Sequence, residues 1–453
     1  MQPHFPPELL DLIMDEAEDS PPTLHSLSLV SKECAFQARR HIFKHIDLGF
    51  KYDAIAREDM EWLRIIRASM ERLRNLRKLF GRNETLASCV KSINIRVELY
   101  DEKTAFIENL PPVLQRLTSL SSVQITGSTD GGFDWKQIPK RVADAIAECL
   151  LQPGIYEVAV YGLRKAPSQL IFSSPSLKRL YLEYMWWGNS LAQTQEHDLL
   201  LPPTGSCTAL TDLVAVTSYE YIETLALASP SLFSHLKTFQ VDFYPSSKSW
   251  IACREILRAC RGTVERIVLR MREVRTVDEE DMSDEEDIPL LPQVKHLDIG
   301  VFSYSWGPAG DPDVPGESLY LSCPNFVQHM RMTLSKYGTN NLEVLESLSL
   351  QIDIYTNTCK VTNDHSLSIL PDTEEWSFLD EYLSGLANNR LQVKLEFVIK
   401  RDVEADELEL LDTRETEAVI DPLSEEASAK LPRSVQTGRL LVTVSITFPV
   451  YDI

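Results

Sequence analysis

Short apolar patterns alternate with helix-like patterns over most of the chain. From residue 90 to about residue 350, one pattern recurs: an apolar residue, two polar or mixed residues, an apolar residue, one variable residue and a further apolar residue. It begins as V-K-S-I-N-I at Val90, and its last clear copy is L-E-S-L-S-L at Leu345. The fourth positions of the copies, used here as anchors, are Ile93, Val123, Val158, Leu180, Leu213, Phe239, Ile267, Leu297 and Leu348.

The last two apolar positions of each copy are two residues apart, which places them on one face of a β-strand. Parallel pairing of successive strands needs a crossover of a dozen or more residues. The gaps between anchors, 22 to 51 residues, provide this length, and helical patterns occupy several of them. One such helix face is formed by Val142, Ile146, Cys149 and Leu150. We therefore predict an α/β array of parallel strands and crossover helices.

The C-terminal part of the chain adds two further strands and two acidic stretches. Leu391–Ile399 and Leu440–Phe448 alternate apolar residues, so we expect strands that pair with each other and cover the edge of the array. The block at 278–287 has eight carboxylates in ten residues and predicts a flexible loop, in which Ser283 resembles an acidophilic kinase site. Residues 402–433 predict a second flexible insertion.

Three short helices are expected in the first 48 residues, before the repeats begin. Pro6 and Pro7 stand directly before the first helix, which suits proline because the missing N–H is not needed there. The apolar faces of the first two helices are Leu9, Leu10, Ile13, Met14 and Ala17, and then Leu24, Leu27, Val30 and Cys34. A third stretch carries Phe36, Ala38, Ile42, Phe43 and Ile46. So small a unit is marginally stable alone, and its remaining apolar face needs a partner.

The sequence of this segment resembles an F-box, in particular the F-box of proteins from mushroom-type fungi. The matching stretches are F-P-P-E-L-L-D-L-I-M-D from Phe5, T-L-H-S-L-S-L-V-S-K-E-C from Thr23, and A-R-R-H-I-F-K-H-I from Ala38. The F-box docks substrate receptors onto the Skp-type adaptor of cullin–RING ubiquitin ligases. The resemblance implies adaptor binding through Phe5, Pro6, Leu9, Leu10, Ile13, Leu27 and Val30.

The segment departs from the F-box pattern at three positions. Phe5 stands where leucine is usual, Leu27 where cysteine is common, and Cys34 where tryptophan is typical. The smaller Cys34 side chain fills less of the small core. The alternative is a plain three-helix cap on a larger domain.

The segment is followed by a predicted amphipathic helix, Asp59–Phe80, whose outer face is rich in arginine. That face is either a docking surface for an acidic partner or simply solvated.

The repeats resemble a leucine-rich-repeat array, whose core pattern is L-x-x-L-x-L. Their spacing is longer and less regular than the roughly 20–29 residues of regular arrays. The asparagine or cysteine that usually follows the last leucine by three residues is also missing, because Met185, Tyr244, Arg272, Phe302 and Asp353 stand there. We therefore expect an irregular solenoid. The alternative is an ordinary three-layer α/β domain.

The sequence predicts three domains. Residues 1–48 form an F-box-like domain, residues 49–82 a linking helix, and residues 83–453 the repeat array.

The overall charge narrows the choice of partners. The chain has 453 residues, with 45 Lys and Arg against 67 Asp and Glu, which gives a net charge of −22. Such a chain repels phosphate backbones and anionic lipid, so we expect neither nucleic acid nor a membrane as partner. There is no run of 18 apolar residues and no secretory signal pattern. The eight cysteines contain no C-x-x-C pair and are interpreted as reduced. We expect a cytoplasmic or nuclear location.

The sequence offers little to support catalysis. We find no phosphate-binding loop, dinucleotide fingerprint, zinc-protease motif or nucleophile elbow. His41 and His45 are four residues apart, but no carboxylate or thiolate lies nearby in the sequence to complete a metal site. We expect no cofactor, no metal and no enzyme. The resemblances imply a substrate receptor of an SCF-type ubiquitin ligase that binds a Skp-type adaptor, a cullin scaffold and an unknown target. The alternatives are a scaffold protein outside any ligase and a hydrolase with diverged motifs.

Overall fold

Alternate residues are buried along the short strands, as expected for a sheet with one covered face. In β3 (Ser122–Thr126) and β5 (Glu157–Tyr161), Val123 and Val158 are fully buried and their direct neighbours are half-exposed. The same alternation is found in β8 (Asp212–Val216). Because side chains alternate between the two faces of a strand, this pattern means that one face packs against other elements and the other does not.

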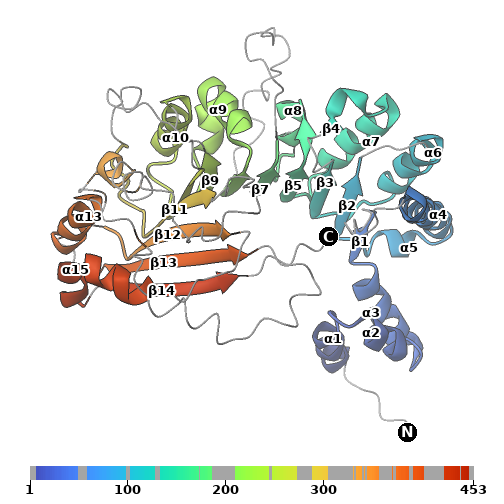
Figure 1. Cartoon of the computed structure of the whole chain (residues 1–453). Helices are drawn as coiled ribbons and strands as arrows, with labels where there is room; N and C mark the ends of the chain where they lie inside the picture. The colour runs from blue at the N-terminus through green and yellow to red at the C-terminus, as the bar shows by residue number, and fades with distance from the viewer. Residues whose placement is uncertain are drawn as a thin grey trace, which may run out of the picture. The chain divides into compact units, whose positions relative to one another are not determined.

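The computed structural model describes residues 7–48, 59–97, 103–127, 133–172, 174–185, 210–243, 247–272, 288–304, 330, 333–338, 341, 344–356, 370, 374–386, 391–401, 423–438 and 440–447. The chain divides into two units, Met1–Leu210 and Thr211–Ile453, which we call unit 1 and unit 2. Both are α/β, and the strands are parallel to their neighbours within each (Figure 1). The α/β class and the parallel pairing predicted from the repeats are thus confirmed.

Unit 1 begins with the three predicted helices and continues with strands and crossover helices. Its main sheet has the order β1-β2-β3-β5-β7, and β4 pairs separately with β6. The elements are α1 (Pro7–Glu16), α2 (Pro21–Leu27), α3 (Lys32–Ile42), β1 (His45–Asp47), α4 (Asp59–Arg82), α5 (Glu84–Ala87), β2 (Ser92–Arg96), α6 (Lys103–Leu114), β3, β4 (Phe133–Asp134), the 3₁₀ turn η1 (Trp135–Gln137), α7 (Lys140–Leu150), β5, β6 (Leu163–Arg164), α8 (Ser168–Ile171) and β7 (Arg179–Glu183).

The predicted anchors of unit 1 stand side by side across the sheet. Ile93, Val123, Val158 and Leu180 are partners in the strand register, and Ile46 of β1 begins the same row. All five side chains are buried. The register therefore builds one continuous apolar row from residues that are far apart in the sequence.

Unit 2 has the strand order β8-β9-β10-β11-β12-β13-β14. Its elements are β8, α9 (Tyr219–Ala228), the 3₁₀ turn η3 (Pro230–Phe233), β9 (Thr238–Phe243), α10 (Ser247–Ala259), β10 (Arg266–Arg272), β11 (His296–Tyr304), β12 (Ser347–Thr356), α13 (Glu374–Ser384), β13 (Gln392–Arg401), α15 (Pro432–Gln436) and β14 (Leu440–Thr447). The register row runs through Leu213, Phe239, Ile267, Leu297, Leu348, Val393 and Leu440. All nine anchors thus lie in parallel strands, and the predicted pairing of the last two strands is confirmed.

The third N-terminal stretch differs from its prediction at its end. The helix α3 ends at Ile42, and Ile46 lies in β1 rather than on a helix face. The reason is backbone pairing: β1 is parallel to β2, and the Leu48 N–H donates to the Asn94 carbonyl at 2.9 Å. The spacing of apolar residues resembled that of a helix, but pairing with a strand 47 residues later determines the conformation of Ile46.

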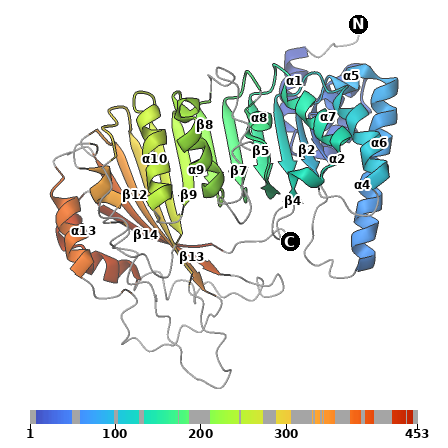
Figure 2. The same cartoon turned by 90° about the horizontal axis from the view of Figure 1, so that it is seen from above.

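The helices of each unit cover one face of its sheet. In unit 2, α9 and α10 lie on the same side of the strands (Figure 2). The opposite face carries half-exposed polar side chains such as Gln240, Ser349 and Gln351. Within the described residues this opposite face is only partly exposed, because Val268, Asp353 and Val398 on it are buried. The predicted crossover helix before β5 is confirmed as α7, with Val142, Ile146, Cys149 and Leu150 buried.

The second predicted flexible insertion is packed over its described part. Residues 423–430 are helical, and Leu423, Ala427 and Leu431 are buried. The buried carboxylate of Asp380 then accepts the backbone N–H groups of Arg433 and Ser434, at 3.1 and 2.8 Å, where α15 begins. The flexible insertion predicted for 402–433 is therefore ordered from residue 423 onward. The predicted acidic loop at 278–287 lies outside the described residues.

The register row predicts a large difference between two neighbouring substitutions in β12. Leu348→Ala removes a fully buried anchor and should lower the free energy of unfolding by roughly 2–5 kcal/mol. Ser349→Ala, on the half-exposed face one residue later, should change it by about 0.5 kcal/mol or less. Urea denaturation of both variants measures this difference. Equal effects would contradict one-sided burial.

Candidate functional site

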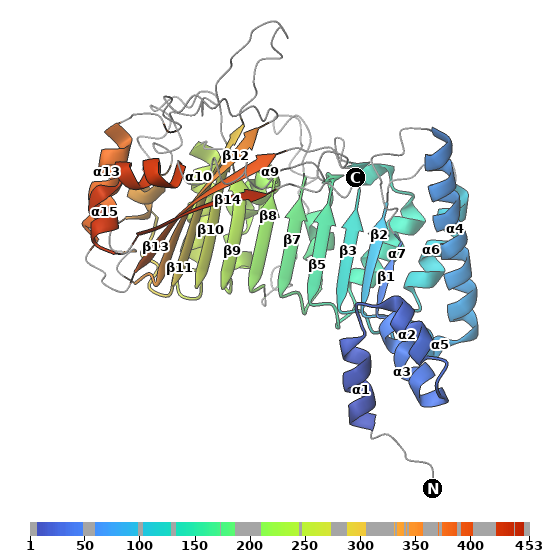
Figure 3. The same ribbon diagram turned by 60° about the horizontal axis from the view of Figure 1, so that its bottom comes forward.

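The first three helices pack around a small apolar core. The core consists of Met14, Ala17, Leu24, Cys34 and Ala38. Ser31 begins α3 by accepting the Cys34 N–H at 3.0 Å, which fixes the start of this helix against the core. Figure 3 shows the three helices together at one end of the unit 1 strands. A core of this size cannot cover every apolar side chain that the three helices carry.

Large apolar side chains are exposed at an unusual density on these helices. Thirteen such side chains are exposed in the described residues, and six of them lie between Leu9 and Phe36. The six are Leu9, Leu12, Ile13, Leu29, Val30 and Phe36, which we call the exposed apolar set. Leu29 and Val30 are the extremes, at 87% and 71% exposure. Groups of exposed apolar side chains mark interaction surfaces more often than chance exposure does.

The residues predicted to bind an adaptor divide into three groups. Leu9, Ile13 and Val30 belong to the exposed apolar set. Leu10 and Leu27 are half-buried and pack against the small core, so they support the helices rather than project from them. Phe5 and Pro6 lie outside the described residues.

Three members of the exposed apolar set were not predicted from the sequence. Leu12 lies three positions after Leu9 and therefore shares its side of α1. Leu29 directly precedes Val30 in the turn after α2. Phe36 was assigned to a buried helix face, but it is exposed. The i+3 spacing was a usable signal for Leu12, whereas the exposure of Phe36 follows from how α3 packs.

A group of charged side chains connects the helices to the sheet. Lys44 Nζ lies 2.6 Å from Glu18 Oε1, His45 Nε2 lies 3.6 Å from the same oxygen, and His41 Nδ1 lies 3.8 Å from Glu18 Oε2. The Lys44 carbonyl also accepts the N–H groups of Lys91 and Ser92, at 2.8 and 3.0 Å. Lys44 therefore ties the end of α1 to the chain that enters β2.

The electrostatics of this group act mainly on Glu18. The hydrogen bond from the Lys44 ammonium lowers the pKa of the Glu18 carboxyl below its ordinary value of 4.5. Burial opposes this lowering, while the charges of Lys44, His41 and His45 add to it. Glu18 is thus held in its charged form at neutral pH.

The fold also brings carboxylates to a histidine that the sequence left without candidate metal partners. Asp15 Oδ1 lies 3.5 Å from His41 Nε2, and Glu18 approaches the other ring nitrogen. No carboxylate is close to His41 along the chain, so the contact arises from the packing of α1 against α3. Asp15 and His41 line a cavity of about 460 Å³, together with Phe36, Arg40 and Cys89.

A second candidate surface is the face of the unit 2 sheet that the described helices leave uncovered. Outward residues of adjacent strands stand in register, so Arg270, Gly300, Gln351 and Glu396 form one transverse row. Gly300 has no side chain, and a Cβ there would lie 3.1 Å from Cγ of Arg270. Because Gly300 has no side chain, the aliphatic part of the Arg270 side chain can lie close to its backbone.

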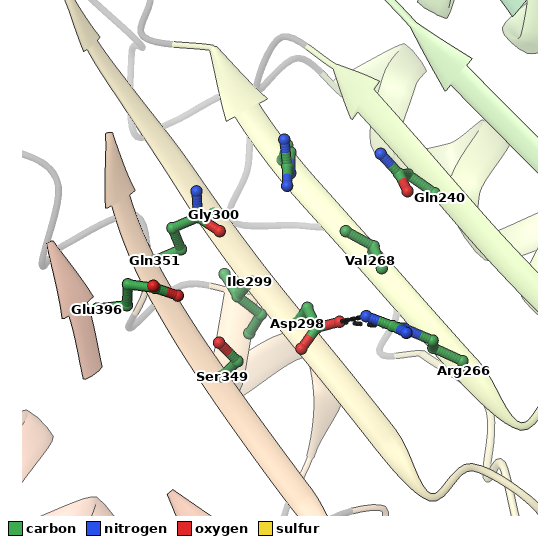
Figure 4. A pocket seen from close by; sticks show the side chains of 10 residues that line it. Gln240, Arg266, Val268, Asp298, Ile299, Gly300, Ser349, Gln351 and Glu396 are labelled. Carbon is green, nitrogen blue, oxygen red and sulfur yellow. Dashed lines mark hydrogen bonds and ion pairs between the residues drawn. The ribbon is translucent and has the colours of Figure 1, made fainter. Parts of the chain in front are cut away.

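A pocket of about 190 Å³ opens around this glycine (Figure 4). Arg266 lies on one side of it, and its Nη2 and Nε are 2.8 and 3.3 Å from Asp298 Oδ2. The remaining lining side chains include amide, hydroxyl and carboxylate groups from Gln240, Ser349, Gln351 and Glu396. Such a surface suits reversible binding of polar groups on another molecule.

The buried thiols of the described residues are poor nucleophiles. Burial raises the pKa of Cys149 and of Cys260 to about 12, and it also raises the pKa of Cys253. Cys34, Cys89, Cys149, Cys253 and Cys260 are free of disulfide bonds. These thiols behave as small apolar side chains.

Comparison with known proteins does not assign a family. No protein-family model matches this chain, and no curated protein matches its sequence at a significant level. The likeness of residues 5–46 to an F-box therefore rests on those residues alone. Among the described residues, no helix combines the length and the apolar character needed to cross a bilayer.

The lowered pKa of Glu18 predicts a pH-dependent contribution to stability. A carboxyl with a lowered pKa in the folded state stabilises the fold above its unfolded pKa, and this stabilisation is lost as the pH falls through the lower value. Glu18→Gln should therefore be less stable than the parent chain at pH 7, and the difference should shrink below about pH 4.5. Urea denaturation across this pH range measures it, with Glu16→Gln as the control at an exposed position. A difference that persists unchanged at acid pH would contradict the assignment.

Proposed function

We propose that this chain is a non-catalytic substrate receptor of an SCF-type cullin–RING ubiquitin ligase. Its N-terminal helices would bind the Skp-type adaptor, and its repeat array would bind a target protein. The observation that supports this most directly is the exposed apolar set on α1, on α3 and in the turn after α2, whose small core cannot cover it. Such a surface is stabilised by a partner that covers it.

The resemblance to an F-box supports the choice of a Skp-type adaptor as the partner. Three sequence stretches match in order. Over the described residues, the first covers most of α1, the second covers α2, the turn after it and the start of α3, and the third covers the rest of α3 and the start of β1. Leu9, Ile13 and Val30, to which the resemblance assigns adaptor binding, are exposed. The half-buried Leu10 and Leu27 pack against the small core of the same helices.

The target would bind to the uncovered face of the unit 2 sheet. The face presents charges of both signs in a fixed register, and the pocket at Gly300 can receive a polar side chain. The mechanism is proximity: the receptor holds the target near the ubiquitin-charged enzyme and raises the effective concentration of its lysines. This role requires no catalytic group on the chain itself.

Adaptor binding is tested by removing two members of the exposed apolar set. Burying a leucine side chain contributes roughly 1.5–3 kcal/mol, so Leu9→Ala with Val30→Ala should weaken adaptor binding by on the order of 3–5 kcal/mol. That is about a 100-fold loss of affinity or more. Calorimetric titration of the purified chain with a Skp-type adaptor measures the loss.

The matched control is Leu227→Ala with Leu441→Ala, two leucines of unit 2 that are comparably exposed. It should leave adaptor affinity unchanged. Thermal unfolding of the helix variant should barely move, because the replaced side chains are exposed. Loss of stability together with binding would instead show a structural cap, and unchanged binding would refute the docking surface.

Target binding is tested on cells that express the chain. Ser349→Arg places a long side chain at the pocket in unit 2 and should abolish those ubiquitin modifications that also disappear with Leu9→Ala and Val30→Ala. Ser122→Arg, at a half-exposed position on the sheet of unit 1, is the control. Quantitative mass spectrometry of ubiquitin remnants gives the comparison. If the adaptor and a cullin co-purify but no modification depends on the chain, the protein is a scaffold and the receptor proposal fails.

A further inference from the structure

Three side chains at the junction of α1 and α3 are arranged as metal ligands. Asp15, Glu18 and His41 each offer one ligand atom, and these atoms all lie within 4.8 Å of one another. Asp15 comes from the last turn of α1, Glu18 from the turn that follows it, and His41 from the last turn of α3. Two sequence-distant segments thus bring an imidazole and two carboxylates close together.

The distances between these ligand atoms are close to those of a metal-bound site. Two ligands bound about 2.1 Å from Zn²⁺ at a tetrahedral angle lie roughly 3.4 Å apart. The distance from Asp15 Oδ1 to His41 Nε2 is 3.5 Å, so this pair is already at that separation. A ligand atom of Glu18 lies within 4.8 Å of the other two, so its side chain completes the set by moving closer through a rotamer adjustment.

His41 has the properties of a preformed ligand. Its side chain is 13% exposed, and Nδ1 is buried without a hydrogen-bond partner among the described residues. Nε2, which lies 3.5 Å from Asp15 Oδ1, is the nitrogen at metal-binding separation, and Nδ1 on the other side of the ring lies 3.8 Å from Glu18 Oε2.

The surroundings favour a cation in two further ways. The carboxyl ends of α1 and α3 lie at the cluster, and the carboxyl end of a helix carries partial negative charge. The cavity lined by Asp15 and His41 gives an ion access from solvent and room for water ligands. Lys44, whose ammonium contacts Glu18 at 2.6 Å, is the cation that holds this carboxylate in the absence of a metal.

We propose that Asp15, Glu18 and His41 form a binding site for a divalent transition metal, with Zn²⁺ as the representative ion. An imidazole with two carboxylates suits such ions, whereas Mg²⁺ and Ca²⁺ prefer oxygen ligands alone. Binding displaces Lys44 from Glu18 and joins the end of α1 to α3. The metal would thereby hold α1, which carries Leu9 and Ile13, in place. The site stands on its own geometry and does not depend on the proposed function.

The test is titration of the full chain with ZnCl₂ by calorimetry, after treatment with a chelator. One ion should bind per chain, and Asp15→Asn should weaken binding by more than the roughly 10-fold that loss of an outer-shell partner typically costs. Asp15 is 63% exposed, so this substitution should leave the fold intact. Lys44→Met should tighten binding, because it removes the competing cation and keeps the aliphatic stem.

The control is Cys89→Ser, since this thiol lines the same cavity. It should leave zinc affinity unchanged, and the Co²⁺-loaded chain should show no thiolate charge-transfer band. In hydrogen exchange, Zn²⁺ should slow the amides of residues 7–18 in the parent chain and not in Asp15→Asn. Zinc binding that survives Asp15→Asn at full affinity, or that is lost in Cys89→Ser, would overturn the site.

Discussion

One-sided burial of short parallel strands is the constraint on which the rest of the structure depends. A strand of five residues, such as β2 or β3, has one apolar face and cannot bury it without neighbours on both sides. A register slip by one residue would move every anchor to the uncovered face. Each unit therefore folds only when its strands pair in the register that forms the buried row, which begins at Ile46 in unit 1 and at Leu213 in unit 2.

The same constraint fixes the N-terminal helices to the sheet of unit 1. Two residues separate the end of α3 from β1, and β1 is paired by its backbone to β2. The ion pair of Lys44 with Glu18 adds a side-chain connection on the α1 side. The N-terminal helices are therefore held in a fixed orientation relative to the unit 1 strands, which suits the positioning role that we propose.

Features set by local period were predictable from the sequence, and features set by packing between distant segments were not. The nine anchors follow from a period of two, and α7 from helical spacing, so both could be located before the structure was known. Ile46 lies in a strand because it pairs with Ile93, 47 residues away. The small core decides that Leu10 is half-buried while Leu12 is exposed.

The candidate sites show the same division. The pattern of apolar residues in α1 predicted a docking surface. The contact of Asp15 with His41 could not be predicted in this way, because it depends on the packing of α1 against α3. The pocket in unit 2 depends on Gly300 standing in register between Arg270 and Gln351, which the repeat pattern did not specify. In both places the candidate site is formed by residues of different helices or strands. The sequence alone does not give the distances between such residues.

The most direct test of the central claim is hydrogen–deuterium exchange of the full chain with and without a purified Skp-type adaptor. Binding through the exposed apolar set should slow amide exchange in α1 and in residues 28–30, and it should leave the strands of unit 2 unchanged. Protection confined to the sheet units, or none in the N-terminal helices at saturating adaptor, would contradict the account.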